Sequence, residues 1–187
     1  MREIEVKAKL RNKNLFLKAT KNLNIEFSKV INQKDVTYEA TLEHDDPNWN
    51  IFRIRKQDDI LILTMKHKAS TRKRDNYEYE TVVANEHETV KILNRLGYKF
   101  AVEVNKKRRT ARYKDLELCL DEVDKLGTFV EVERLIDNDA DVDKVQDELW
   151  TLLIQLGVGP EDRIYQAYDT MMKQFLSDNK IFQPKLS

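Results

Sequence analysis

The sequence of 187 residues contains few of the residues that mark several large protein classes. Its one cysteine, Cys119, cannot form a disulfide within the chain, which is typical of a reducing compartment. Four glycines and three prolines are too few for a collagenous or linker-rich chain. No apolar run approaches the roughly 20 residues of a membrane-spanning helix, and the charged residues 1–7 contain no signal-peptide core. We therefore expect a soluble, cytoplasmic protein with no membrane partner.

An excess of one charge sign is also lacking, because 33 basic and 33 acidic residues cancel. This balance argues against a protein that binds nucleic acid through its overall charge. The charges are nevertheless segregated along the chain. Residues 53–74 and 106–114 are mainly basic, whereas residues 115–148 are mainly acidic. The sequence therefore predicts local charge clusters.

Charged and apolar residues alternate with the period of a β-strand in seven places. The predicted strands are residues 3–8, 52–55, 60–66, 76–82, 102–106, 116–121 and 129–133. Apolar residues at helical spacing predict helices at residues 15–23, 86–96, 143–156 and 164–175. Strands and helices do not alternate as a parallel sheet requires, so we expect an α+β domain with an antiparallel sheet of seven or eight strands. It should occupy residues 1–178, followed by a C-terminal tail at 179–187.

The charged faces of these strands carry both signs, while the opposite faces are uniformly apolar. One charged strand face is most simply exposed to solvent. At least six strands share the mixed pattern, however, and a closed barrel with a polar lumen and an apolar exterior under helices would produce it. Such a lumen would contain the cations Lys7, Arg53, Arg55, Lys66, Lys106 and Arg108 and the carboxylates Glu3, Glu5, Glu78, Glu80, Asp121, Glu131 and Glu133.

This predicted set of charges favours a particular ligand. Clustered cations need a highly charged anion, and clustered carboxylates need divalent cations. Oxygen ligands favour Mg²⁺ or Mn²⁺ over zinc. A metal–triphosphate complex meets both needs, with Arg and Lys on the phosphates and Glu and Asp on the metal. A glycine-rich phosphate loop is absent from the sequence, so side chains must bind the phosphates.

The order of short motifs resembles one family over about residues 1–172. Glu3-x-Glu5-x-Lys7 resembles the ExExK signature of the CYTH, or triphosphate tunnel metalloenzyme, superfamily. The motifs that follow are Asp35-x-x-Tyr38, Phe52-Arg53-Ile54-Arg55, Leu63-Thr64-Met65-Lys66, Tyr77-Glu78-Tyr79-Glu80, Lys106-x-Arg108 and the block from Leu120 to Glu133. That last block is similar to the class IV adenylate cyclase branch.

The resemblance implies a closed antiparallel eight-stranded β-barrel, a triphosphate tunnel, with helices packed outside. It implies metal ligands for Mg²⁺ or Mn²⁺ at Glu3, Glu5, Asp121, Glu131 and Glu133. The triphosphate would be bound by Lys7, Arg53, Arg55, Lys66, Lys106 and Arg108. Among these residues, Glu5, Lys7, Lys106 and Arg108 are the predicted catalytic groups.

Three functions remain open at this point. The favoured one is an adenylate cyclase that converts ATP to cyclic AMP and pyrophosphate. The alternative is a triphosphatase acting on inorganic triphosphate, thiamine triphosphate or a nucleoside triphosphate. A third is a binding module for RNA or polyphosphate, which the carboxylates on the same strands argue against. The sequence leaves open whether the protein forms a homodimer. Residues 68–74 are expected to form a solvated basic loop. Cys119 lies two positions from Asp121 and is therefore expected on the same strand face.

Overall fold

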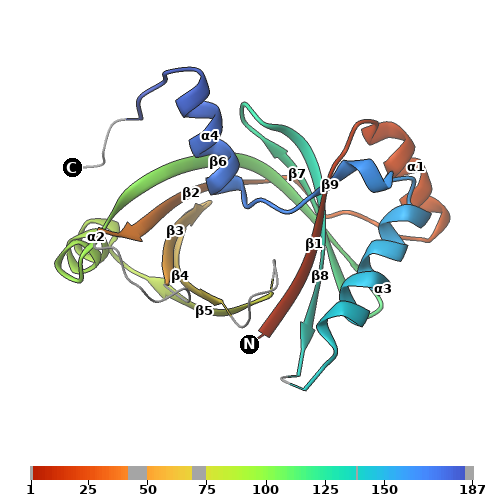
Figure 1. Cartoon of the computed structure of the whole chain (residues 1–187), viewed down its shortest axis with the longest axis horizontal. Coiled ribbons are helices and arrows are strands. Elements are labelled where there is room, and N and C mark those ends of the chain that lie inside the picture. Colours follow the sequence, from red (N-terminus) through yellow and green to blue (C-terminus); the bar gives the residue numbers. More distant parts are fainter. Residues whose placement is uncertain (1, 42–49, 69–74, 138, 184–187) are drawn as a thin grey trace.

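The computed structural model describes residues 2–41, 50–68, 75–137 and 139–183. Within these ranges the chain forms nine strands and four α-helices (Figure 1). The strands are β1 (Arg2–Lys9), β2 (Ile31–Ala40), β3 (Ile51–Gln57), β4 (Ile60–Lys68), β5 (Asp75–Val83), β6 (Tyr98–Tyr113), β7 (Leu116–Val123), β8 (Gly127–Ile136) and β9 (Arg163–Ile164). The helices are α1 (Lys13–Asn22), α2 (Glu86–Arg95), α3 (Val142–Gln155) and α4 (Tyr168–Asp178), with a 3-10 turn at Pro160–Asp162.

Strands β1 to β8 close into one antiparallel barrel, as predicted. The hydrogen-bonded order is β5-β4-β3-β2-β6-β7-β8-β1, and β1 also pairs with β5. That closing contact is short, because it joins only Arg2, Glu3 and Ile4 of β1 to Tyr77, Asn76 and Asp75 of β5. The side chain of Arg2 reinforces it with two hydrogen bonds to Asp75, of 2.9 and 3.0 Å. Farther along β1, Lys7 and Ala8 pair instead with β9.

The apolar faces of the strands point outward, as predicted from the alternation. On β1, Ile4, Val6 and Ala8 are buried outside the barrel in a core that also contains Phe16 of α1 and Leu149 of α3. Helix α2 covers a second cluster around β2 and β3 on the other side of the barrel (Figure 1). Helices α1, α2 and α3 therefore remove outer sheet faces from water, and the charged faces of the same strands are directed into the lumen. Helix α4 differs, because it packs with Val104 and Phe129, which lie opposite Asp35 and Asp121 on the lumen face.

Side chains at the helix ends explain where three of the helices begin. The side chains of Asn12, Asn85 and Asp141 each accept a backbone N–H from the first turn of α1, α2 and α3. Gly97 and Gly157 follow the ends of α2 and α3 with φ angles of 88° and 86°, which glycine adopts without strain. The predicted helices 15–23, 86–96 and 143–156 are confirmed as α1, α2 and α3, with ends within two residues of the prediction.

The structure differs from the sequence-based expectation in three elements. Strand β2 was not predicted, because only Val36 and Tyr38 give it a buried apolar outer face. Strand β6 is 16 residues long, whereas only residues 102–106 were predicted as a strand. The prediction was too short because the basic run 106–109 hides the alternation of charged and apolar residues. The last helix begins at Tyr168, not at residue 164, because Arg163 and Ile164 pair with β1.

Several expectations lie outside what the structure addresses. Residues 69–74, which make up most of the predicted basic loop, fall outside the described ranges. The domain boundary at residue 178 coincides with the end of α4 and stays a prediction. Among the described helices, none combines the length and hydrophobicity needed to cross a membrane.

Candidate functional site

The six cations predicted from the sequence all belong to lumen-facing positions of the barrel. Lys7 comes from β1, Arg53 and Arg55 from β3, Lys66 from β4, and Lys106 and Arg108 from β6. Paired neighbours share a face in a sheet, and these residues lie opposite other lumen positions: Lys7 opposite Glu131, Arg53 opposite Thr64 and Arg108 opposite Asp121. The barrel therefore brings together basic residues that lie up to 101 positions apart in the sequence.

Arg108 occupies the centre of one charged group. Its guanidinium donates to both carboxylate oxygens of Asp121, at 2.7 and 2.5 Å, and to Glu131. Glu131 also pairs with Lys7, whose ammonium lies 2.8 Å away and is 1% exposed. Burial by itself would lower the pKa of Arg108, but the surrounding anionic groups, among them Asp121 and Glu131, raise it. This group therefore retains its charges inside the barrel.

Asp35 of β2 holds a second group together. It accepts two hydrogen bonds from Arg55, of 2.7 and 2.9 Å, and lies 3.5 Å from the ammonium of Lys106. Burial would raise the pKa of Asp35, but Lys106 and Arg55 outweigh burial and hold it well below its usual range. Burial and the neighbouring Arg108 lower the pKa of Lys106 to about 8. Lys106 is thus a cation that an additional anion would stabilise.

A third group lies on β3, β4 and β5. Arg53 donates to Thr64 at 3.0 Å and to Glu80 at 3.1 Å, and Lys66 pairs with Glu78. Burial would raise the pKa of Glu78, but Lys66 and Arg53 lower it. Each of the six predicted cations therefore has a carboxylate partner within the barrel. A triphosphate would have to replace some of these partners.

Three of the five predicted metal ligands form a carboxylate cluster. Glu3, Glu5 and Glu133 each place one oxygen so that all three atoms lie within 4.8 Å of one another. Burial and the carboxylate of Glu78 raise the pKa of Glu3 from 4.5 to about 7. Burial and the carboxylate of Glu3 raise the pKa of Glu133 well above its usual range. Carboxylates held this close repel one another, and a divalent cation would relieve the repulsion.

The other two predicted ligands, Asp121 and Glu131, have different surroundings. Both accept hydrogen bonds from Arg108, and Glu131 also contacts Lys7. They lie on the neighbouring strands β7 and β8, on the lumen face. The structure therefore places all five carboxylates in one lumen but divides them between the carboxylate cluster and the Arg108 ion pairs.

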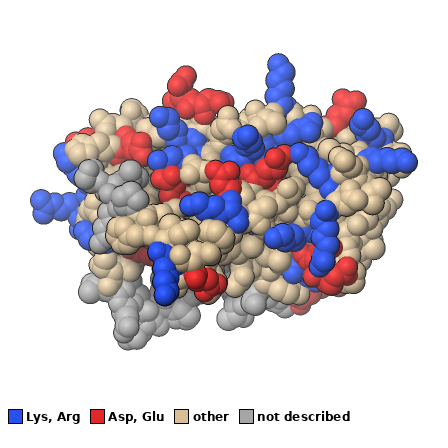
Figure 2. All heavy atoms as spheres, turned by 90° about the horizontal axis from the view of Figure 1, so that it is seen from above, with Lys and Arg blue, Asp and Glu red and all other residues tan. Residues whose placement is uncertain are grey.

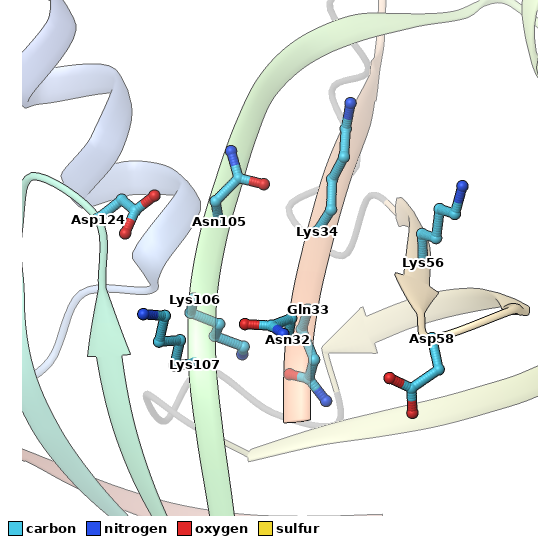
Figure 3. A pocket seen from close by; sticks show the side chains of 9 residues that line it. All are labelled: Asn32, Gln33, Lys34, Lys56, Asp58, Asn105, Lys106, Lys107 and Asp124. Atoms are coloured by element: carbon cyan, nitrogen blue, oxygen red, sulfur yellow. The ribbon is translucent and has the colours of Figure 1, made fainter. Parts of the chain in front are cut away.

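A pocket of about 470 Å³ opens at one end of the barrel (Figure 3). It lies between the start of β2, the middle of β6 and the turns that follow β3 and β7, which contribute Asp58 and Asp124. Gln33 and Lys106, which are paired across β2 and β6, line its inner part. Because Lys106 also contacts Asp35 and Asp121, the pocket reaches the charged lumen.

Sequence reasoning missed several residues of the lumen. Asp35 was named in a family motif but was not predicted to face the lumen. Gln33, Asp35 and Thr37 occupy every second position of β2, and this polar strand face could have been recognised in the sequence. Tyr168 falls within the predicted helix 164–175 and was not among the predicted site residues, yet its ring covers the ammonium of Lys7 at 3.5 Å. Nothing in the local sequence of Tyr168 indicates this contact. Cys119 lies on the lumen face as predicted, is fully buried, and has a pKa raised by burial.

The outer surface has a different charge distribution from the lumen. Lys and Arg side chains are interspersed with Asp and Glu side chains over the face seen in Figure 2. Lys13 with Glu122 and Lys173 with Glu39 are examples of such outer pairs. Among the described residues of that face, basic side chains are therefore separated by acidic ones.

Comparison with known proteins identifies relatives that cover nearly the whole chain. The family model described as "CYTH domain" matches residues 1–168. A Methanocaldococcus jannaschii protein named "putative adenylate cyclase" is 27% identical over 169 residues, covering 90% of this chain and 97% of that protein.

Solved structures of other proteins also resemble this chain over nearly its whole length. A conserved hypothetical protein from Pyrococcus furiosus superposes with a TM-score of 0.76 at 25% identity, covering 90% of this chain and 98% of that one. A Hippeastrum protein described as a "putative adenylyl cyclase" with a dominant triphosphatase activity superposes with a TM-score of 0.59 at 15% identity, covering 98% of each chain, and shares the fold. With its tunnel-like barrel and a family match over residues 1–168, the chain belongs to the CYTH domain family.

Proposed function

We propose that this protein is a metal-dependent enzyme that acts on a triphosphate inside the barrel, and that its reaction is the conversion of ATP to cyclic AMP and pyrophosphate. The observation that carries the proposal is the shared lumen. Glu3, Glu5 and Glu133 gather their oxygens within 4.8 Å of one another in the same barrel that contains six cations. Few ligands other than a metal-bound polyphosphate need both kinds of group at once.

The carboxylate cluster is the proposed metal site. Glu3, Glu5 and Glu133 would hold Mg²⁺ or Mn²⁺, with Asp121 of β7 and Glu131 of β8 as the proposed further ligands. Their donor atoms are all oxygens, which suit these hard cations. When bound, a divalent cation neutralises charge on phosphate oxygens. The raised pKa of Glu3 supports this site, because clustered carboxylates without a cation retain protons at neutral pH.

The cations are the proposed triphosphate site. Lys7 of β1 pairs with Glu5 of the carboxylate cluster and with Glu131, and Lys106 and Arg108 of β6 pair with Asp121. Arg53, Arg55 and Lys66 lie on β3 and β4 and extend the basic lining around the lumen. A bound triphosphate would take hydrogen bonds that Asp35, Asp121 and Glu131 now accept, and these carboxylates would turn to the metal or to water. Such charge-assisted contacts orient the phosphates and stabilise the charge that develops during transfer.

In the proposed reaction the ribose 3′-hydroxyl of ATP attacks the α-phosphorus. The new bond closes the cyclic phosphodiester, the bond to the β-phosphate oxygen breaks, and pyrophosphate leaves while the hydroxyl proton passes to solvent or to a nearby base. The Methanocaldococcus jannaschii relative named "putative adenylate cyclase" supports this direction. A triphosphatase is the second candidate, because the same cations would serve the attack of water on a terminal phosphate.

Product analysis distinguishes the candidates. The purified protein is incubated with ATP, 3′-deoxy-ATP, inorganic triphosphate or thiamine triphosphate, each with Mg²⁺ or Mn²⁺ and with a chelator control. The cyclase predicts equal amounts of cyclic AMP and pyrophosphate from ATP and no product from 3′-deoxy-ATP. Orthophosphate released equally fast from ATP and 3′-deoxy-ATP would establish the triphosphatase instead. Binding of all four compounds without turnover would refute an enzyme and leave the binding module.

A further inference from the structure

Helix α4 carries an aromatic side chain into the lumen. Figure 1 shows α4 lying along β6, and its first residue, Tyr168, is 8% exposed. The ring of Tyr168 packs edge-on against Phe129, with the centroids 5.3 Å apart. Phe129 lies opposite Asp121 in the β7–β8 ladder and therefore faces the lumen. Tyr168 thus reaches the same compartment as the charged groups.

The ring of Tyr168 contacts two of the cations proposed to bind phosphate. The ammonium of Lys7 lies 3.5 Å from the ring centroid and that of Lys106 lies 5.2 Å from it. An aromatic face attracts a cation and replaces water on one side of it. Lys7 and Lys106 are 1% and 5% exposed, so little water competes for them. The ring therefore holds both ammonium groups on one side and leaves their other sides for anions.

The hydroxyl of Tyr168 has no hydrogen-bond partner among the residues that the structure describes, although it is buried. A phenol with its ordinary pKa of about 10 is protonated at neutral pH, so the hydroxyl is a donor. A buried donor without a partner costs stability, and phenylalanine would give the same apolar packing without that cost. Packing of α4 alone does not explain a tyrosine here.

We propose that Tyr168 is a substrate-binding residue of the tunnel: its ring holds Lys7 and Lys106 in place, and its hydroxyl donates a hydrogen bond to an oxygen of the triphosphate bound between them. The inference rests on the proposed function, since it assigns a residue to the same site. It adds a contact from the C-terminal helix to a site otherwise built from barrel strands. It also gives a partner to a buried donor that has none among the described residues.

The substitution Tyr168→Phe tests the hydroxyl, and Tyr38→Phe is its matched control. Tyr38 is also buried with a hydroxyl that has no partner among the described residues, but it packs with Ile54 and Leu93 outside the barrel. Binding of magnesium tripolyphosphate is measured by calorimetry for the wild type and both variants. Melting temperatures are measured without ligand.

Tyr168→Phe should weaken binding by about 10- to 100-fold, because a hydrogen bond to a charged group is lost. Its ligand-free melting temperature should stay equal to that of the wild type or rise. Tyr38→Phe should bind like the wild type. A third variant, Tyr168→Leu, also loses the ring and should bind more weakly than Tyr168→Phe.

The outcomes separate this inference from the proposed function. A wild type that does not bind magnesium tripolyphosphate would refute the proposed function itself. If the wild type binds, an affinity of Tyr168→Phe within about twofold of it would overturn the role of the hydroxyl. If Tyr38→Phe lost as much affinity as Tyr168→Phe, the effect would not be specific to the lumen, and the assignment of the Tyr168 hydroxyl to the binding site would be overturned. Equal affinities of Tyr168→Leu and Tyr168→Phe would overturn the role of the ring.

Discussion

Replacing Glu3 by glutamine should stabilise the metal-free protein at pH 8 and reduce the dependence of its stability on pH. Burial and the carboxylate of Glu78 raise the pKa of Glu3 from 4.5 in a solvated chain to about 7 in the barrel. Between these pH values the folded protein retains a proton that the unfolded chain has released. Stability therefore falls as the pH rises through this window, and above pH 7 the full penalty is present.

The size of the effect follows from the two pKa values of Glu3. Their difference corresponds to roughly 3 kcal/mol at most, at about 1.4 kcal/mol for each pH unit. Glu3 shares its surroundings with Glu5 and Glu133, which would relax when it is neutralised. We therefore expect a gain of about 1–3 kcal/mol for Glu3→Gln at pH 8, or about 3–10 °C in melting temperature for a chain of this length.

Thermal melting in a chelator at pH 5 and pH 8 measures this effect. The control is Glu88→Gln, because Glu88 is an exposed residue of α2 that pairs only with Lys91 among its described neighbours. The stabilisation of Glu3→Gln should be smaller at pH 5 than at pH 8. Added Mg²⁺ should raise the melting temperature of the wild type more than that of the variant. A variant no more stable than the wild type at pH 8, or more strongly stabilised at pH 5, would refute the reasoning.

Three other predictions address binding, folding and reactivity. Lys106→Ala and Arg108→Ala should each weaken magnesium tripolyphosphate binding by about 10- to 100-fold in calorimetry, since a charge-assisted contact is lost. The control Arg109→Ala, on the outer face of β6, should bind like the wild type. Asp75→Asn should cost about 3 kcal/mol or more in urea unfolding, because it leaves Arg2 without its carboxylate at the β1–β5 contact; an unchanged midpoint would contradict this role. Cys119 should react with a thiol reagent only after unfolding, because it is buried and its pKa is raised; rapid labelling of the native protein would contradict its position.

The alternation of residues along single strands was sufficient to predict much of this site. Glu3, Glu5 and Lys7 occupy every second position of β1, so one lumen face could be assigned from the sequence alone. The same holds for Arg53 and Arg55 on β3. On β6 the basic run 106–109 hides the alternation, so Lys106 and Arg108 were assigned from the spacing of the family motif. The prediction of a closed α+β barrel with charges inside is confirmed. The roles given to these residues in binding and catalysis stay predictions.

The partners of these charges could not be predicted from the sequence. Whether Asp121 and Glu131 join the carboxylate cluster or pair with Arg108 depends on the distances set by barrel closure. The contact of Asp35 with Arg55 and Lys106 required β2, a strand whose few apolar residues gave no clear signal. Electrostatic contacts between residues far apart in sequence depend on register and on burial, neither of which is encoded locally.

The sequence by itself determined the lumen face of most strands and the helices that cover the exterior, because these follow from local periodicity. The metal–triphosphate ligand inferred from the types of charge stays a proposal. The tertiary structure alone decided how the barrel closes at Arg2 and Asp75, which three carboxylates gather, and that Tyr168 reaches Lys7. The last contact joins residues 161 positions apart. It exists because α4 packs along β6 and thereby brings its first turn into the lumen, which no local pattern specifies.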